Sequence, residues 1–247
     1  MRHVLPIAAS PEPHVTMRDE PLPRIGSGVK PPAPPKPTLM EDAYRQLEEM
    51  IVTLEIAPGS VVSEAILSRS LNIGTTPIRE ALQRLAREHL VQILPRRGVI
   101  VTEVDVRQQL QVLEVRRELD RLIMRSAARR ANAAERQAFT DMADGMRKAV
   151  EADDVREFLR LDGAFNQRAA AAARNPIAAE TVAALHAISR RFWFFHHRDL
   201  ADMPQTAELH IQVMRAIAAG DENAAAQGAE RLIDQLADLA KSTLPLG

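Results

Sequence analysis

Residues 75–85 read Thr-Thr-Pro-Ile-Arg-Glu-Ala-Leu-Gln-Arg-Leu, and this run constrains the fold more than any other part of the chain. Thr76 is a favourable N-cap residue and Pro77 suits the first position of a helix, so the run predicts that a helix begins here. The apolar residues recur on one helical face, at Ile78, Leu82 and Leu85. Arg79 projects near the start of this helix. The pattern is typical of a helix that presents its first turn to a phosphate or to the edge of a base.

Short elements on both sides of this helix complete a larger arrangement. Upstream, Ser63-Glu64 begins a short helix that continues from Ala65 to Leu71. Downstream, residues 91–94 and 99–101 are two β-rich runs, joined by the basic turn Pro95-Arg96-Arg97-Gly98. Helix, turn, helix and then a hairpin with a basic tip predict a winged helix-turn-helix.

These motifs, in this order, resemble the winged-helix signature of the GntR family of bacterial transcriptional regulators, over about residues 39–103. The resemblance rests on Tyr44 to Leu47, Ala57-Pro58-Gly59, Ser63-Glu64, Pro77 to Leu82, Leu90-Val91 and Arg97-Gly98. It implies a homodimer that binds double-stranded operator DNA. We expect the DNA contacts to come from Ser63, Thr75, Thr76, Arg79, Arg84, Arg96, Arg97 and Gly98.

The DNA-binding half departs from many of its relatives at positions that contact the operator. Ala65 stands where they carry an arginine, and Gly74-Thr75 replaces a Ser-Arg pair, so Arg79 alone remains of three such arginines. Each lost arginine removes a contact to guanine worth ~1–3 kcal/mol, so the operator should differ from the usual half-site. Residues 39–103 hold seven Arg and no Lys against nine acidic residues. DNA affinity must therefore come from the local placement of the arginines.

Composition sets further bounds on the 247-residue chain. It contains no cysteine, which excludes a disulfide framework and a thiolate metal site. No stretch approaches 18 apolar residues, and the apolar run at residues 4–9 is too short for a signal peptide. We therefore expect a cytoplasmic protein with no membrane contact. Ten of the sixteen prolines lie in residues 1–37, which predicts an extended, disordered tail that ends at a capping box of Thr38 and Glu41.

After residue 103 the apolar spacing is helical almost throughout, and helix-starting signals occur in the run Thr102-Glu103-Val104-Asp105, at Asp153 or Asp154, and at Asn175-Pro176. We expect a mainly α fold, with an N-terminal winged helix-turn-helix in residues 38–103 and an all-α antiparallel bundle of about six helices in residues 104–241. This second half resembles the effector-binding (FCD-type) domain of the FadR branch of the same family. The matching phrases are Glu114 to Asp120, Leu161 to Phe165, Asn175-Pro176 and His210 to Asp221.

Helical rotation places five polar residues on or beside the apolar faces of this half: Arg116, Asp162, Asn166, His196 and His210. Isolated charges in an apolar core are costly, so these groups must be paired or must face a polar ligand. One interpretation is an internal network, in which Arg116 pairs with Asp120 or Asp162 and His210 donates to a carbonyl. The other is an effector site, in which Arg116 holds the carboxylate of a small organic acid. The convergence of four helices, together with the resemblance, favours the effector site.

Many members of this effector domain bind a divalent metal through one Asp and three His. The family pattern places these positions at Asp162, Asn166, His210 and Leu232, so two of the four ligands are missing. An Asp, an Asn and a single His suit a transition metal poorly, so we expect no cofactor and no bound metal. If a divalent metal is present, Asp162 and His210 should bind it, with His196 as a substitute ligand.

We therefore expect a one-component transcription factor, acting as a repressor, whose operator affinity changes when a small carboxylate binds to the helical half. Two other classes of protein stay open. An enzyme could use Asp162 and His210 as an acid/base pair, although no nucleophile or phosphate-binding loop accompanies them. An interaction module with a degenerate DNA-binding half would explain the lost arginines.

Overall fold

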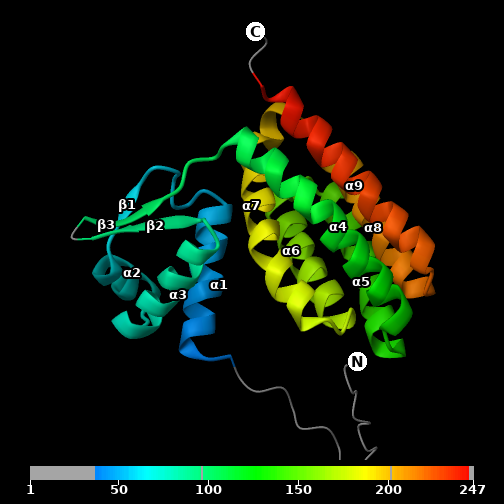
Figure 1. Ribbon diagram of the computed structural model, residues 1–247, viewed down its shortest axis with the longest axis horizontal. Coiled ribbons are helices and arrows are strands. Elements are labelled where there is room, and N and C mark those ends of the chain that lie inside the picture. Colours follow the sequence, from blue (N-terminus) through cyan, green and yellow to red (C-terminus); the bar gives the residue numbers. More distant parts are fainter. Residues whose placement is uncertain (1–36, 96, 201, 245–247) are drawn as a thin grey trace, which may run out of the picture. The chain divides into compact units, whose positions relative to one another are not determined.

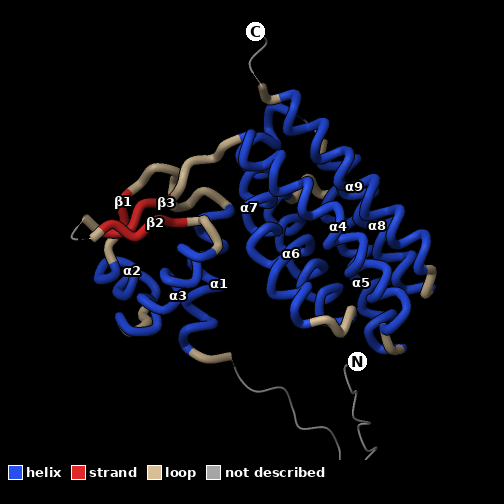
Figure 2. Tube along the Cα trace, viewed as in Figure 1, coloured by secondary structure: helices blue, strands red, loops and turns tan. Residues whose placement is uncertain are grey.

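The computed structural model describes residues 37–95, 97–200 and 202–244 of the chain. A winged-helix half with three helices and a small sheet is followed by a half made of helices alone (Figures 1 and 2). The mainly α fold class is therefore confirmed. The predicted tail lies outside the described residues up to residue 36. None of the helices in the described ranges combines the length and the apolar character needed to cross a membrane.

In the first half, helix α1 spans Leu39–Val52, α2 spans Glu64–Leu71 and α3 spans Thr75–Arg87. The predicted capping box begins α1, because Oγ1 of Thr38 accepts a hydrogen bond from the amide of Glu41 at 3.2 Å. The apolar face predicted for α3 is buried against α1 in a core that includes Leu47, Ile78, Leu82 and Leu85. The predicted helix-turn-helix is thus present.

Three antiparallel strands form the wing, in the order β1-β3-β2. They are β1 (Val61–Val62), β2 (Val91–Leu94) and β3 (Gly98–Val101). The sequence predicted the β2–β3 hairpin but missed β1. Two residues are too few to show a period-2 pattern, and β1 is defined only by its pairing, of Val61 with Ile100 and of Val62 with Val99.

Helix α3 begins two residues earlier than predicted. Its N-cap is Gly74, whose carbonyl accepts a hydrogen bond from the amide of Ile78 at 3.3 Å. The prediction of Thr76 as the N-cap and Pro77 as the first helical residue was therefore wrong. Proline is tolerated throughout the first turn, where the amides have no intrahelical acceptor, so Pro77 did not fix the start.

The second half consists of α4 (Val106–Arg130), α5 (Ala133–Glu151), α6 (Val155–Ala172), α7 (Pro176–Leu200), α8 (Met203–Ala219) and α9 (Glu222–Ser242). The side chains of Asp105, Asp154 and Asn175 accept hydrogen bonds from first-turn amides, so the predicted helix starts at these positions are confirmed. Asn132 and Asp221 cap α5 and α9 in the same way. Helix α4 packs along α9, and α5 along α8 (Figure 1). Phe139, Phe158 and Phe165 lie in the shared core.

Helix α7 is buried on two sides. Its Ala187 and Ile188 belong to the core of the winged-helix half, together with Val112 of α4. Its Phe192 and Trp193 belong to the core of the helical half. Side chains around most of the α7 circumference are therefore candidates for contacts between elements that are distant in sequence.

Candidate DNA interface and effector site

The first turn of α3 presents free hydrogen-bond donors. The amides of Thr75 and Thr76 have no intrahelical acceptor, as in the first turn of any helix. No side chain caps this helix either, so these amides remain available to a ligand. Both threonine side chains are exposed. Free amides at the positive end of a helix dipole are suited to a phosphate oxygen, so this turn can contact the DNA backbone.

Arg79 lies one turn later and is held by Glu64 of α2. Its Nε atom lies 3.1 and 3.0 Å from the two carboxylate oxygens of Glu64, and its Nη2 atom lies 2.8 Å from Oε2. These hydrogen bonds raise the pKa of Arg79 above its ordinary value. Ser63, which we expected to contact DNA, caps α2, since its Oγ accepts from the amide of Ile66 at 3.2 Å. The Ser63-Glu64 pair therefore positions both helices of the motif.

Arg84 lies on a different face of α3 from Arg79. Its guanidinium stacks 3.7 Å from the centroid of the Tyr44 ring, and its Nε donates to Oε1 of Glu88 at 3.0 Å. Tyr44 donates to the same carboxylate at 2.7 Å. Five residues of helix correspond to a rotation of about 140°, so Arg79 and Arg84 face different directions. This placement argues against the expected DNA contact of Arg84, which instead joins α3 to α1.

The tip of the β2–β3 hairpin is exposed and carries Arg97. Gly98 follows with a φ of +97°, and a Cβ there would lie 3.1 Å from the carbonyl oxygen of Val62 and 3.3 Å from Cγ1 of Val61. The position therefore requires glycine, on grounds of both conformation and space. Arg96, the other basic residue expected at the tip, lies outside the described residues.

In the helical half, Arg116 and Asp120 form a buried ion pair. The Nε and Nη2 atoms of Arg116 lie 3.0 and 2.8 Å from Oδ2 of Asp120, and Nε2 of His186 lies 2.7 Å from the other carboxylate oxygen. Burial alone would raise the pKa of Asp120, but Arg116 and His186 lower it to about 2. Arg116 thus already has an anionic partner. Of the two interpretations of this residue, the structure shows the internal network.

Asp162 is the centre of a second buried group. Its Oδ1 atom accepts from Nδ2 of Asn166 at 2.9 Å and lies 2.9 Å from Nε2 of His210. The other ring nitrogen of His210 lies 2.9 Å from the carbonyl oxygen of Thr206. Burial would raise the pKa of Asp162, but the hydrogen bond and charge of His210 lower it overall. Both ring nitrogens of His210 therefore lie within hydrogen-bond distance of an oxygen atom of the protein.

A cavity of about 20 Å³ lies between these two groups, with Arg116, Asp162, Arg190, Trp193 and His210 among its lining residues. This space suits a single water molecule. A small organic acid needs more room, so the predicted effector residues do not enclose a ligand-sized site in this conformation.

The donor set does not fit a divalent metal. In the part of the chain that the structure describes, no three His, Cys, Asp or Glu side chains come together as a metal site requires. The Nε2 atom of His210 lies 2.9 Å from Oδ1 of Asp162, and the amide nitrogen of Asn166 donates to the same oxygen. Leu232 belongs to the apolar core. A metal ligand must offer a free lone pair, so we assign no role to a metal here.

His196 is not among the residues that line the small cavity. It is half-buried on α7, with its ring centroid 4.6 Å from that of Phe192 and 4.9 Å from that of Phe195. The histidine of α7 that contacts the buried Arg116–Asp120 ion pair is His186, which the sequence did not predict. Its spacing of four residues from Arg190 on one face of α7 was the available signal.

Two arginines of α7, also missed, connect the two halves. Arg190 forms an ion pair with Glu48 of α1. Arg191, which is 1% exposed, donates to the carbonyl oxygens of Thr102 and Glu103 at 3.0 and 3.2 Å. Burial lowers the pKa of Arg191 to about 10. Helix α7 is thereby tied both to α1 and to the segment that links β3 with α4.

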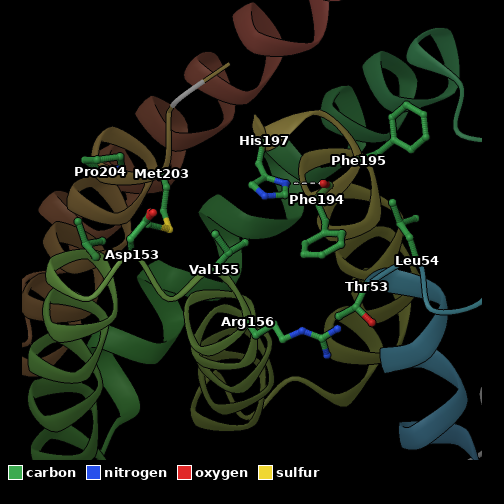
Figure 3. A pocket seen from close by; sticks show the side chains of 11 residues that line it. Thr53, Leu54, Asp153, Val155, Arg156, Phe194, Phe195, His197, Met203 and Pro204 are labelled. Atoms are coloured by element: carbon green, nitrogen blue, oxygen red, sulfur yellow. Dashed lines mark hydrogen bonds between the residues drawn. The ribbon is translucent and has the colours of Figure 1, made fainter. Parts of the chain in front are cut away.

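Two larger hollows flank α7. A groove of about 370 Å³ lies between α1 and α3 on one side and α6 and α7 on the other, and it reaches Asn166, His186 and Arg190. A hollow of about 920 Å³ is lined by residues that include Thr53, Arg156, Phe194, His197 and Met203 (Figure 3). None of the five predicted effector residues lines this larger hollow. Asn166 lines the groove and also donates a hydrogen bond to Asp162.

Both halves match known protein families. Residues 39–101 match the family described as bacterial regulatory proteins, gntR family, and residues 111–235 match the FCD domain. The chain is 25% identical over 204 residues to the uncharacterized HTH-type transcriptional regulator YdfH of Escherichia coli O6:H1, covering 83% of this chain and 90% of the relative. It is 24% identical, with the same coverage, to the HTH-type transcriptional repressor RspR of Escherichia coli K12. The solved structure of E. coli McbR/YncC covers 84% of this chain and 99% of its own, with a TM-score of 0.73 at 18% identity.

Proposed function

We propose that this chain, which belongs to the GntR family of bacterial regulatory proteins and carries an FCD domain, is a repressor whose affinity for operator DNA changes when a small carboxylate binds. It is a DNA-binding transcriptional regulator with a C-terminal effector domain, and not an enzyme. Repression is supported by the relative RspR, which is named a repressor. The Asp162–His210 pair, which the alternative enzyme would use, is buried and hydrogen-bonded internally.

One observation carries the DNA-binding role in this structure. The uncapped first turn of α3 exposes Thr75 and Thr76, and Glu64 holds Arg79 just beyond them. The amides can position the helix on a phosphate, while a guanidinium held in place can reach a base edge. Arg97 at the wing tip adds a contact to the backbone. We place the DNA contacts on these residues.

A carboxylate is the effector class that the partly buried Arg190 favours. This arginine lines both the small cavity and the 370 Å³ groove, and its Nε atom has no hydrogen-bond partner among the described residues. Arginine matches carboxylate in geometry and stays charged when buried.

The protein would act in the cytoplasm, where bacterial DNA lies.

We propose a homodimer, and α4 offers a surface for it. Helical spacing predicts that Val115 and Leu122 of α4 face the core. In the structure they are 51% and 46% exposed. They form a second apolar strip on the outside of the helix, and such a strip is typical of an interface. In a dimer, the two copies of α3 could each contact one half of a pseudo-palindromic site.

An operator-binding experiment tests the proposal. Labelled DNA from the region upstream of the chain's own gene is titrated with the purified protein, with a scrambled duplex of equal length as the control. We expect a complex of two chains per site that forms at much lower protein concentration than with the scrambled DNA, and that weakens as salt rises. Equal affinity for both duplexes would contradict sequence-specific regulation.

A further inference from the structure

Arg190 occupies an unusual position between two spaces. Its side chain lines both the 20 Å³ cavity in the helical half and the 370 Å³ groove beside α1. It reaches both because Gly163 of α6 leaves room, since a Cβ at that position would overlap Nη1 of Arg190. The guanidinium therefore lies directly against the α6 backbone.

The hydrogen bonding of Arg190 is incomplete. Its Nη2 donates to Glu48 of α1, whereas its Nε atom is buried and has no hydrogen-bond partner among the described residues. A buried donor without an acceptor is costly. A ligand with two acceptor oxygens would satisfy this arginine better than the single contact with Glu48 does.

Glu48 is a weak competitor for this arginine. Burial raises the pKa of Glu48 above its ordinary value, Arg190 offsets this only in part, and the nearby charge of Glu88 raises it further. The carboxylate is thus held in a dry environment beside a second negative charge. These conditions disfavour the charged form of Glu48, so a ligand carboxylate can compete with it for Arg190.

The groove has the shape and chemistry of a small-molecule site. Its volume of about 370 Å³ falls within the usual range for such sites, roughly 300–1,000 Å³. Small apolar side chains form much of its wall, at Ala170, Ala171, Ala179, Ala183 and Ala187. Polar groups come from Asn166, His186 and Arg190, and further along the wall from Glu48, Arg84, Gln167 and Glu180. A molecule with a compact apolar body and one carboxylate is complementary to this surface.

We propose that the effector binds in this groove and that its carboxylate replaces Glu48 as the partner of Arg190. This inference rests on the proposed function and specifies its effector site. Glu48 belongs to α1 of the DNA-binding half, so the exchange breaks a tie between the two halves. The ligand thereby favours the arrangement in which this tie is absent, which is the differential affinity that regulation requires.

The test measures the binding of benzoate to the full-length protein without DNA, by calorimetry, with neutral benzamide as a matched control ligand. Glu48→Gln should bind benzoate about tenfold or more tightly than the wild type, because the competing charge is removed. Adding Arg190→Gln should abolish this gain, and benzamide affinity should not respond to either change. The control variant is Glu55→Gln. Glu55 forms another ion pair between the halves, with Arg156 at 2.9 Å, and neither residue lines the groove.

The proposal is overturned if Glu48→Gln leaves benzoate affinity unchanged, if no benzoate binds to it at tens of millimolar, or if Glu55→Gln has the same effect. Should the double variant not fold, Gly163→Ala in the Glu48→Gln background displaces the guanidinium and should likewise remove the gain. These affinities are measured without DNA. Their failure therefore leaves the operator-binding proposal standing, and failure of operator binding leaves them unaffected.

Discussion

The Nε2 atom of His210 lies 2.9 Å from a carboxylate oxygen of Asp162, and the Nδ1 atom of the same ring lies 2.9 Å from the carbonyl oxygen of Thr206. Both ring nitrogens face oxygen atoms of the protein, so internal contacts hold the imidazole on both sides. Asn166 donates to the same carboxylate oxygen, so the amide nitrogen, which cannot bind a metal, is the atom that faces Asp162.

Protein purified without added metal should therefore contain no stoichiometric zinc, nickel or manganese. A chelator should leave its melting temperature unchanged, because no part of the folding free energy comes from a metal. Elemental analysis and a thermal melt with and without chelator check this. The matched control is a variant with Asn166→His and Leu232→His, which restores the family's ligands and should gain chelator-sensitive stability. One metal per wild-type chain would contradict the prediction.

The DNA interface predicts different effects for three arginines. Arg79→Ala should cost ~1–3 kcal/mol of specific binding, because a base contact is lost. Arg97→Ala should weaken binding to all sequences and reduce its salt dependence. Arg84→Ala should leave the discrimination between operator and scrambled DNA intact, since its guanidinium is engaged with Tyr44 and Glu88. Anisotropy titrations at several salt concentrations measure all three, and operator affinity that survives both Arg79→Ala and Arg97→Ala rules out this interface.

The buried Arg116–Asp120 pair predicts a loss of stability that a second substitution should repair. Arg116→Met leaves Asp120 buried with His186 alone, and breaking such a pair costs ~3–5 kcal/mol. The double variant with Asp120→Leu should recover part of this, since both charges of the ion pair are then removed and only Nε2 of His186 loses its contact. Urea denaturation gives both values. If Arg116→Met is instead fully stable but no longer responds to effector, Arg116 binds the ligand directly.

The lowered pKa of Asp120 predicts acid sensitivity. Its pKa is about 2 in the folded protein against 3.8 as the ordinary value, so the folded state favours the charged form. The resulting stability, roughly 2 kcal/mol, is fully present above about pH 4 and is lost as pH falls towards 2. Denaturation curves between pH 5 and pH 2 should show this loss in the wild type. Asp120→Asn should be less stable at pH 5 and should lose less between these limits.

The features that the sequence predicted correctly depend on neighbouring residues. Asp105, Asp154 and Asn175 begin helices because their side chains accept hydrogen bonds from amides three residues ahead, and such signals are visible along the chain. The helical face of Ile78, Leu82 and Leu85 is local in the same sense. The start of α3 was misplaced because a proline is compatible with several first-turn positions.

The features that the sequence missed depend on residues far apart in the chain. His186 reaches Asp120 across 66 positions, and Arg190 reaches Glu48 across 142. Helix α7 packs on two sides, so a search for one apolar stripe with polar interruptions pointed to His196 instead. Helical rotation predicts that Arg116 lies in the core, but the identity of its partner depends on how α4 packs against α7, where His186 holds Asp120 beside it.

The close approach of Gly163 and Arg190 predicts a substitution that acts against the usual trend. Replacing glycine by alanine inside a helix commonly stabilises a protein by ~0.5–1 kcal/mol. Gly145→Ala in α5 should do so, since the new Cβ would lie 3.5 Å from Cδ1 of Leu161, an ordinary contact. Gly163→Ala should instead destabilise by roughly 1–3 kcal/mol, because the displaced guanidinium leaves Glu48 buried without its partner.

A double-mutant cycle locates the origin of that loss. In the Glu48→Gln background, Gly163→Ala should cost much less, because no buried charge is then left without its partner. Urea denaturation of the four proteins gives the coupling free energy between positions 163 and 48, which we expect to be about 1 kcal/mol or more. Gly145→Ala should show no coupling to Glu48→Gln. If Gly163→Ala proves as stabilising as Gly145→Ala, the guanidinium moves aside freely, and its ion pair with Glu48 contributes nothing measurable to the link between α1 and α7.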